Sequence, residues 1–255
     1  MVSLANYNPI HEISIFGNID NLVKDFHNLL FDGIKSKKSR SQNFNIALSG
    51  GSAIRIFEKY KELFSSNINA ENLHVYWVDE RCVPPDNSES NYGNARKFLE
   101  SINIPEPNIH RIKGEIDPLS ESLRYQDLLY KNIPVENGFP QFDLIMLGIG
   151  EDGHTGSIFP NRLELFKTDS ICAVTIHPVS SQQRITLTGK VINNACNIIF
   201  IATGKLKAEI IEKIIKRKSG FESHPAAHVL SVHGKLKWFL DTAAGALVKD
   251  CEVMR

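Results

Sequence analysis

The chain has 255 residues, of which 42% are hydrophobic and 23% charged, the composition of an ordinary globular protein. It carries 29 basic and 29 acidic residues, and this balance argues against nucleic acid or an anionic membrane as the main partner. No apolar run approaches the roughly 20 residues that cross a bilayer, and residues 1–16 lack the pattern of a signal peptide. The four cysteines lie at no zinc-finger spacing, so we expect reduced thiols in a cytoplasmic protein.

Short apolar segments alternate with helical patterns along the chain. The strands predicted in chain order are 11–16, 44–48, 73–78, 142–147, 171–176, 184–188, 196–201 and 236–240. The predicted helices are 18–34, 54–64, 90–101, 119–132, 205–217 and 241–248. Asp20 lies in the expected N-cap region of the first helix, and a polar loop is expected at 35–42. Residues 102–118 contain Pro105, Pro107 and Pro118 and are expected to form an ordered loop.

Apolar strands without strict alternation, separated by helices, predict an α/β fold with a mostly parallel sheet covered by helices on both faces. No repeat or boundary interrupts the pattern, so we expect residues 1–255 to form a single domain. In such sheets the ligand binds beyond the carboxyl ends of the strands. Polar, glycine-rich segments follow the strands at 44–48, 73–78 and 142–147, which places a candidate site at that edge.

The first of these segments is Ser49-Gly50-Gly51-Ser52, between a strand and a helix. Glycines there let backbone N–H groups approach an anion, and the helix N-terminus adds partial positive charge. The alternative is that the glycines only relieve steric crowding in a tight turn. The segment is neither a P-loop nor a dinucleotide-binding fingerprint.

The second segment is Asp79-Glu80-Arg81. In a functional interpretation Asp79 orients a catalytic group or a sugar hydroxyl, and Arg81 neutralises a phosphate or a developing oxyanion. In the alternative interpretation these charges only mark where a buried strand reaches solvent.

The third segment, 148–157, places three glycines ahead of His154. A histidine on a tight backbone at a strand end is well placed for proton transfer near neutral pH, although it could also be structural. What would orient it is left open between Asp79, Asp152 and a backbone carbonyl. Ser157 is not in a G-x-S-x-G motif, which argues against a serine nucleophile.

Further basic residues lie near the predicted strand ends. Arg184 begins an apolar run, and Lys205 and Lys207 begin a helix, where a bound anion would offset their unfavourable position; solvated lysines are the alternative. His224 and His228 have a spacing that could bind metal on a helix, but no acidic ligand motif is adjacent.

The chain contains, in order, ALSGGS (47–52), VYWVDERCVPPDNSESNYGNAR (75–96), FDLIMLGIGEDGHTGSIFP (142–160), RITLTGKVINNA (184–195), TGKLKA (203–208) and KWFLDTAA (237–244). These segments resemble the 6-phosphogluconolactonase family, within the larger glucosamine-6-phosphate isomerase/lactonase superfamily. The resemblance implies a Rossmann-like parallel sheet and hydrolysis of 6-phospho-D-glucono-1,5-lactone to 6-phosphogluconate, a step of the oxidative pentose phosphate pathway. It implies a small sugar-phosphate substrate and no metal or organic cofactor. Monomer and homodimer both stay open.

The resemblance also implies roles for individual residues. His154 matches the general base that activates water for attack on C1 and then returns the proton to the ring oxygen. Asp79 and Arg81 match the pair near the sugar. The implied phosphate-binding residues are Ser49, Gly50, Gly51, Ser52, Arg184 and Lys207.

Three segments differ from the usual family pattern. Ala53-Ile54-Arg55 replaces Thr-Pro-Lys, residues 177–181 lack the lysine of a Ser-Pro-Lys-Pro-Pro loop, and His228 replaces an arginine. Two other functions remain as alternatives. A glucosamine-6-phosphate deaminase would typically have tyrosine in place of Arg81 and a glutamate after its histidine loop. A non-catalytic sugar-phosphate sensor would bind phosphate without turnover.

Overall fold

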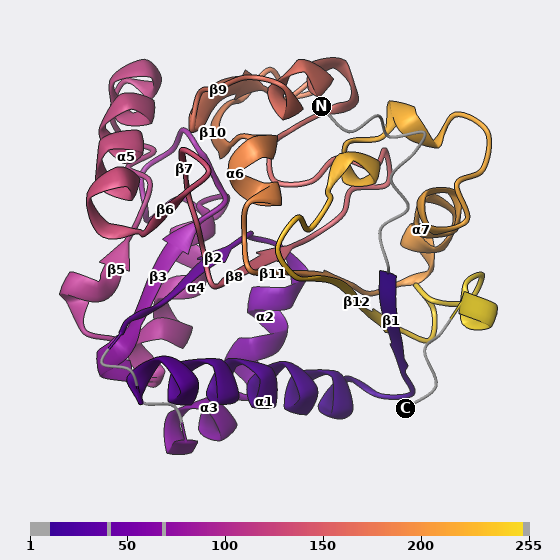
Figure 1. Cartoon of the computed structure of the whole chain (residues 1–255), viewed down its shortest axis with the longest axis horizontal. Coiled ribbons are helices and arrows are strands. Elements are labelled where there is room, and N and C mark those ends of the chain that lie inside the picture. Colours follow the sequence, from indigo (N-terminus) through magenta and orange to yellow (C-terminus); the bar gives the residue numbers. More distant parts are fainter. Residues whose placement is uncertain (1–10, 40–41, 68–69, 252–255) are drawn as a thin grey trace.

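The computed structural model describes residues 11–39, 42–67 and 70–251, without the side chains of Ser52, Ser66 and Asn67 (Figure 1). The strands are β1 (His11–Phe16), β2 (Phe44–Leu48), β3 (Leu73–Trp77), β4 (Asp79–Arg81), β5 (Ile109–His110), β6 (Val135–Glu136), β7 (Phe139–Pro140), β8 (Leu144–Leu147), β9 (Cys172–Ile176), β10 (Gln183–Leu187), β11 (Asn197–Ala202) and β12 (Lys235–Asp241). The α-helices are α1 (Ile19–Lys38), α2 (Ser52–Lys59), α3 (Lys61–Asn67), α4 (Asn91–Ser101), α5 (Pro118–Asn132), α6 (Gly189–Asn193) and α7 (Ala208–Ile215). The short 3₁₀ helices are η1 (Ala70–Asn72), η2 (Glu106–Asn108), η3 (Pro160–Phe166), η4 (Lys205–Lys207), η5 (Phe221–Ser223), η6 (Pro225–His228) and η7 (Lys249–Cys251).

A seven-stranded sheet in the order β1-β12-β11-β8-β2-β3-β5 forms the centre of the molecule. All of its pairings are parallel. Every residue of β2 and of β8 is buried, as expected for central strands covered on both faces. Helices α1 and α2 lie on one side of this sheet and α6 on the other (Figure 1). The predicted α/β fold is therefore confirmed.

The strand order places a topological switch point between β2 and β8. From β2 the chain continues outward to β3 and β5, whereas from β8 it continues in the opposite direction to β11 and β12. Loops that leave neighbouring strands in opposite directions open a crevice at the carboxyl ends, where ligands of such folds bind. The segments after β2 and β8 are the turn at 49–52 and the loop at 148–154.

A second sheet corrects the expectation for three segments. Strands β4, β10 and β9 form a separate antiparallel sheet, so Asp79-Glu80-Arg81 is itself a strand. The predicted strands at 171–176 and 184–188 exist but belong to this sheet and not to the parallel one. Apolar composition alone does not say which sheet a strand joins, because that depends on long-range pairing.

Several predicted helix boundaries were wrong. Helix α1 continues through residues 35–38 of the expected loop at 35–42, because its last-turn lysines suit a helix C-terminus and Lys37 pairs with Asp143 at 2.7 Å. Asn18, not Asp20, caps its start by accepting a hydrogen bond from the backbone N–H of Asn21. The helix expected at 54–64 is interrupted at Tyr60, and the one at 205–217 begins as a 3₁₀ turn and ends at Ile215.

The helix expected at 241–248 is absent, and turns follow β12 instead. The carboxylate of Asp241 explains the difference, because it accepts backbone N–H groups from Gly204 (3.0 Å) and Ala244 (2.7 Å) and so stabilises a turn. The loop expected at 102–118 is largely present, although Ile109–His110 adds a short strand to the sheet edge. Within the described residues, none of the helices combines the length and apolarity needed to cross a membrane.

Candidate active site

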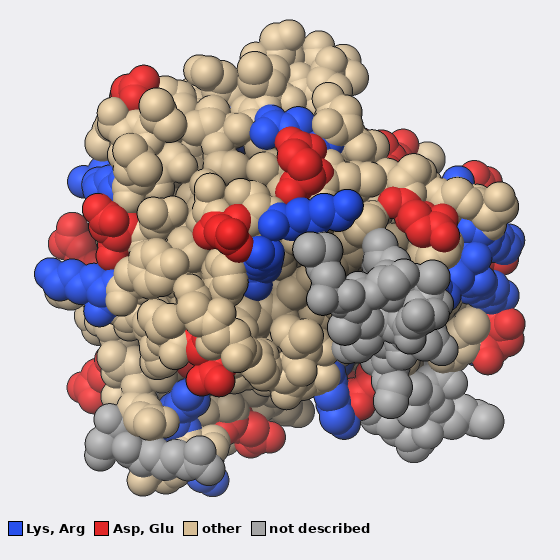
Figure 2. Space-filling model, turned by 45° about the horizontal axis from the view of Figure 1, so that its top comes forward, with Lys and Arg blue, Asp and Glu red and all other residues tan. Residues whose placement is uncertain are grey.

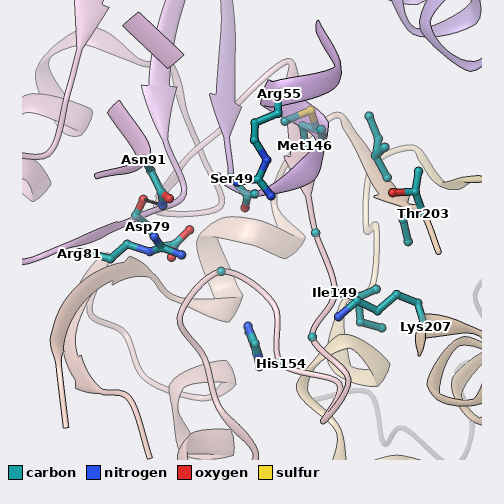
Figure 3. A pocket seen from close by; sticks show the side chains of 18 of the residues that line it. Ser49, Arg55, Asp79, Arg81, Asn91, Met146, Ile149, His154, Thr203 and Lys207 are labelled. Carbon is teal, nitrogen blue, oxygen red and sulfur yellow. Dashed lines mark hydrogen bonds between the residues drawn. The ribbon is translucent and has the colours of Figure 1, made fainter. Parts of the chain in front are cut away.

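A pocket of about 370 Å³ lies at the switch point, where β2, β8 and β11 end beside the second sheet (Figure 3). Its lining includes all the predicted site residues whose side chains are described: Ser49, Gly50, Gly51, Asp79, Arg81, His154, Arg184 and Lys207. Helix α2 begins at Ser52, whose side chain lies outside the described part of the structure. On the face shown in Figure 2, basic and acidic side chains are interspersed. The concentration of basic groups in the pocket is therefore a local feature.

The turn at 49–51 presents polar groups to the pocket from the end of β2. The Ser49 hydroxyl is buried and finds no hydrogen-bond partner among the described residues. Gly51 has φ +96°, a conformation that favours glycine, and leads directly into α2. A Cβ on Gly50 would lie only 1.9 Å from Asn91 Oδ1, so the backbone can approach helix α4 only without a side chain there. This turn can present a hydroxyl to an anion beside a helix N-terminus.

Asp79 is buried at the edge of the pocket. Its Oδ2 accepts a hydrogen bond of 2.6 Å from the Ser157 hydroxyl, and its backbone oxygen accepts one of 2.9 Å from Asn91 Nδ2. Ser157 is fully buried and committed to this bond. The structure therefore makes Ser157 a support for Asp79, in line with the argument against a serine nucleophile.

Glu80 has a different role from its two neighbours. Its buried carboxylate accepts backbone N–H groups from Arg81 (2.8 Å), Asn91 (2.7 Å) and Tyr92 (2.8 Å) and the hydroxyl of Ser90 (3.1 Å). Burial raises the pKa of Glu80, and the hydrogen bonds from the three backbone groups oppose that rise. Glu80 thus ties β4 to the start of α4, while the residues on either side face the pocket.

Arg81 and Arg184 lie directly opposite each other on β4 and β10. Among the described residues neither guanidinium forms an ion pair, and both Nε atoms are buried without a hydrogen-bond partner. Arg81 Nη1 donates to the backbone oxygen of Glu89. Burial lowers the pKa of Arg184, and the charge of Arg81 lowers it further. Two adjacent, partly desolvated guanidinium groups form a strong site for an anion.

His154 is held by Asp152 from within the same loop. Its Nδ1 lies 2.6 Å from Asp152 Oδ1, and its backbone N–H donates to the same oxygen at 3.1 Å. Burial raises the pKa of Asp152, but the hydrogen bonds and the charge of His154 outweigh it and lower that pKa to about 2. An ionised Asp152 favours a proton on Nδ1, so that Nε2 of the neutral ring is able to accept a proton.

The open question of what orients His154 is therefore answered by Asp152. Asp79 instead receives Ser157. Gly150 makes the arrangement possible, because a Cβ there would lie 2.1 Å from His154 Nδ1 and 2.5 Å from Asp152 Oδ1. In Figure 3 the His154 ring lies across the pocket from Ser49, with Arg81 and Lys207 on either side.

Two further polar side chains line the pocket: Arg55, which the sequence showed only as a departure from the family pattern, and Asn91, which it did not single out. Arg55 lies in the first turn of α2. Its position shortly after the Gly-Gly turn could have predicted that it lines the pocket. Asn91 lies in the segment 75–96, which resembles the family. Only the fold shows that its side-chain amide donates to the backbone oxygen of Asp79. Lys207 also lines the pocket, with its Nζ 4.0 Å from Glu151 Oε1.

The rings of His224 and His228 contact different backbone groups and are not arranged as a pair of metal ligands. His224 Nδ1 lies 2.8 Å from the backbone oxygen of Asp152, whereas His228 Nε2 lies 2.6 Å from that of Glu222. No group of three or more His, Cys, Asp or Glu side chains arranged to hold a metal occurs within residues 11–39, 42–67 and 70–251. Neither histidine lines the pocket.

Comparison with known proteins identifies the family. The model of glucosamine-6-phosphate isomerases/6-phosphogluconolactonase matches residues 17–238, a range that includes every element around the pocket. The chain belongs to this family. The predicted family resemblance is thereby confirmed over most of the sequence.

Several relatives of this family are similar along most of their length. A 6-phosphogluconolactonase of Haemophilus influenzae is 41% identical over 80% of this chain and 87% of its own. The crystal structure of a protein named devB is 38% identical, covers 93% of this chain and 99% of its own, and superposes with a TM-score of 0.85. A 6-phosphogluconolactonase from Trypanosoma brucei is 25% identical, covers 95% and 100%, and has a TM-score of 0.82.

The structure clarifies the three departures from the family pattern. Arg55 lines the pocket, so this chain keeps a cation in the segment where the pattern has lysine. His228 lies outside the pocket lining, against Phe166. In the 177–181 turn, His177 Nδ1 accepts backbone N–H groups from Val179 (3.2 Å) and Ser180 (3.1 Å), which stabilises the turn without a lysine.

Proposed function

We propose that this chain hydrolyses 6-phospho-D-glucono-1,5-lactone to 6-phosphogluconate in the oxidative pentose phosphate pathway, with His154 as the general base. The observation that carries the proposal is the Asp152–His154 hydrogen bond of 2.6 Å, at a pocket that also contains two arginines without an ion pair among the described residues. A base and an anion site in one pocket are what hydrolysis of a phosphorylated lactone requires. The names of the similar proteins support the same substrate.

The first step is addition of water. His154 Nε2 takes a proton from a water molecule as its oxygen attacks the C1 carbonyl, and the carbonyl electrons move onto oxygen. Asp152 stabilises the imidazolium that forms, because its carboxylate bonds the opposite ring nitrogen. Arg81, with Asp79 beside it, faces the sugar and stabilises the developing oxyanion.

The second step opens the ring. The tetrahedral intermediate collapses, the bond between C1 and the ring oxygen breaks, and His154 returns its proton to that oxygen as it leaves. One water is consumed, and the product is a carboxylic acid that ionises at neutral pH. The chain needs no further reactant for this balance.

The phosphate is assigned to the turn at 49–52 together with Arg184 and Lys207. The unpartnered Ser49 hydroxyl and the start of α2 provide neutral donors, and the two cations provide charge. Arg55 adds a further cation to the pocket lining. The assignment leaves His154 free to act at the other end of a six-carbon substrate.

The proposal extends to the organisation of the protein. We assign all its elements to a single domain with a small sugar phosphate as its partner, acting as a monomer or a homodimer. The described cysteines are free, which suits the cytoplasm. A related protein of Arabidopsis thaliana is named as chloroplastic.

A turnover assay tests the function. Glucose-6-phosphate dehydrogenase generates the lactone in situ, and its disappearance is compared with the spontaneous rate, with and without EDTA. Acceleration that survives EDTA and is lost in His154→Ala supports the proposal. A wild-type rate equal to the spontaneous rate contradicts it, and glucosamine-6-phosphate is then the next substrate to assay.

A further inference from the structure

The loop that carries the base is attached to a segment outside the pocket. His224 lies between η5 and η6, and its Nδ1 is 2.8 Å from the backbone oxygen of Asp152. A carbonyl oxygen can only accept, so Nδ1 must carry the hydrogen. We propose that His224 is a positioning residue that holds Asp152, and through it His154, in the orientation that proton transfer requires. The inference rests on the proposed function.

A second contact acts beside the first. The backbone N–H of Ala226 donates to the backbone oxygen of Gly153 at 2.9 Å, so two consecutive carbonyl groups are bound by one segment. Gly153 has φ +80°, and a Cβ there would lie 2.7 Å from the Cβ of His224. The histidine therefore packs directly on the loop backbone as well as bonding to it.

These contacts differ from the loop's internal bonds. Gly150 N–H donates to the His154 oxygen at 2.9 Å, and Gly153 N–H donates to the Gly150 oxygen at 3.0 Å. Internal bonds preserve the shape of the loop but do not fix where the loop lies in the molecule. The bonds from His224 and Ala226 connect it to a separate part of the chain, which fixes the Asp152 carboxylate relative to the pocket.

The second ring nitrogen of His224 makes the role of the first more specific. Nε2 is buried and has no hydrogen-bond partner among the described residues. A buried polar atom without a partner is unfavourable, so the stabilising hydrogen bond of this side chain is the one made by Nδ1. Asparagine places an N–H near the position of Nδ1 and has no atom at Nε2. We therefore expect asparagine, but not an apolar residue, to replace His224.

Two variants of the full chain test the proposal. His224→Leu fills the space without a donor and should lower kcat by on the order of tenfold, since displacing a catalytic group by about 1 Å can cost up to 10²-fold. Its KM should stay within about twofold, because the phosphate-binding groups are untouched. His224→Asn should match the wild type in both kcat and KM.

Direct observation of the His154 ring completes the test. Imidazole ¹⁵N chemical shifts should show a proton on Nδ1 of His154 in the wild type and in His224→Asn, and a mixture of tautomers in His224→Leu. This readout needs no turnover, so an inactive wild type would contradict the proposed function and still leave the positioning role measurable.

Two results would overturn the positioning role. One is a His224→Leu variant with unchanged kcat and unchanged ring shifts, and the other is equal impairment of the Asn and Leu variants. If a thermal melt shows that His224→Leu does not fold, His224→Gln replaces it. It has the same amide as asparagine, displaced by one methylene, and a wild-type kcat and unchanged ring shifts in it would likewise overturn the proposal.

Discussion

The two sides of the pocket differ in how completely the protein satisfies its own polar atoms. On the His154 side, Asp152 binds both Nδ1 and the backbone N–H of the histidine. On the arginine side, the Nε atoms of Arg81 and Arg184 and the hydroxyl of Ser49 are buried without partners in the described structure. The proposed base is thus organised by contacts within the protein, whereas the proposed anion site offers donors that a bound anion would accept from.

This difference separates two kinds of contribution to catalysis. Groups that are already oriented lower the barrier without reorganisation at the moment of reaction. Buried donors without partners are unfavourable until a ligand accepts from them, so they favour binding of an anion. We therefore expect substitutions on the first side to reduce kcat and those of Ser49 and Arg184 on the second side to raise KM, whereas substitution of Arg81, which we assign to the oxyanion, should also reduce kcat.

The largest effect is expected for the base itself. His154→Ala should lower kcat by about 10²–10⁴, the usual contribution of general base catalysis, while 6-phosphogluconate still binds. The lactone assay gives kcat, and calorimetry gives the product affinity. His233→Ala is the matched control, because this histidine is exposed and outside the pocket lining. Full activity of His154→Ala would remove the base assignment.

The next effect tests whether Asp152 is what organises the histidine. Asp152→Asn should lower kcat by on the order of 10², because the amide no longer selects the tautomer with Nδ1 protonated. KM should change little. Asp169→Asn replaces an exposed aspartate that pairs with Lys190 outside the pocket lining, and it should leave kcat unchanged. A wild-type kcat in Asp152→Asn would show that the orientation of His154 does not depend on this carboxylate.

A smaller effect is expected for the two cations that we assign to the phosphate. Arg184→Ala and Lys207→Ala should each raise KM by about tenfold, since hydrogen bonds to charged groups contribute about 1.5–3 kcal/mol. Their kcat should stay near the wild-type value. Inorganic phosphate should raise the melting temperature of the wild type and less so that of Arg184→Ala. Unchanged KM in both variants would place the phosphate elsewhere.

The smallest effect concerns stability and pH. The pKa of Asp152 is lowered from 3.8 to about 2 in the folded chain, so its interactions stabilise the fold above pH 3.8. That contribution is lost as the pH falls from there through about 2. Urea unfolding of the wild type and Asp152→Asn should therefore differ most at neutral pH and converge toward pH 2. A constant difference across this range would indicate that Asp152 is not bonded to His154 in solution.

The sequence predicted the pocket well because its parts follow strands. Segments at the carboxyl ends of parallel strands share one edge, so Ser49 and His154 could be brought together without knowledge of their contacts. The parallel sheet follows from local apolar runs such as 44–48 and 142–147. Neither inference needs side-chain detail.

The rest depended on pairing between distant parts of the chain. Whether residues 79–81 form a strand is decided by β10, more than 100 residues later, and that pairing is what sets Arg81 opposite Arg184. The inward direction of Glu80 follows from the three backbone N–H groups and the hydroxyl that surround it. The helix expected at 241–248 was wrong because an aspartate side chain bonds the backbone of two separate segments. These are tertiary contacts, and they override local propensity.

The close approach of Gly50 to Asn91 links two segments of the chain in evolution. Any side chain at position 50 would collide with the Asn91 amide, whose oxygen lies 1.9 Å from where a Cβ would be. A shorter residue at position 91 would relieve the collision but give up the bond to the Asp79 carbonyl. We therefore expect descendants of this sequence to change both positions together or neither, so that the turn and the helix start are inherited as a pair.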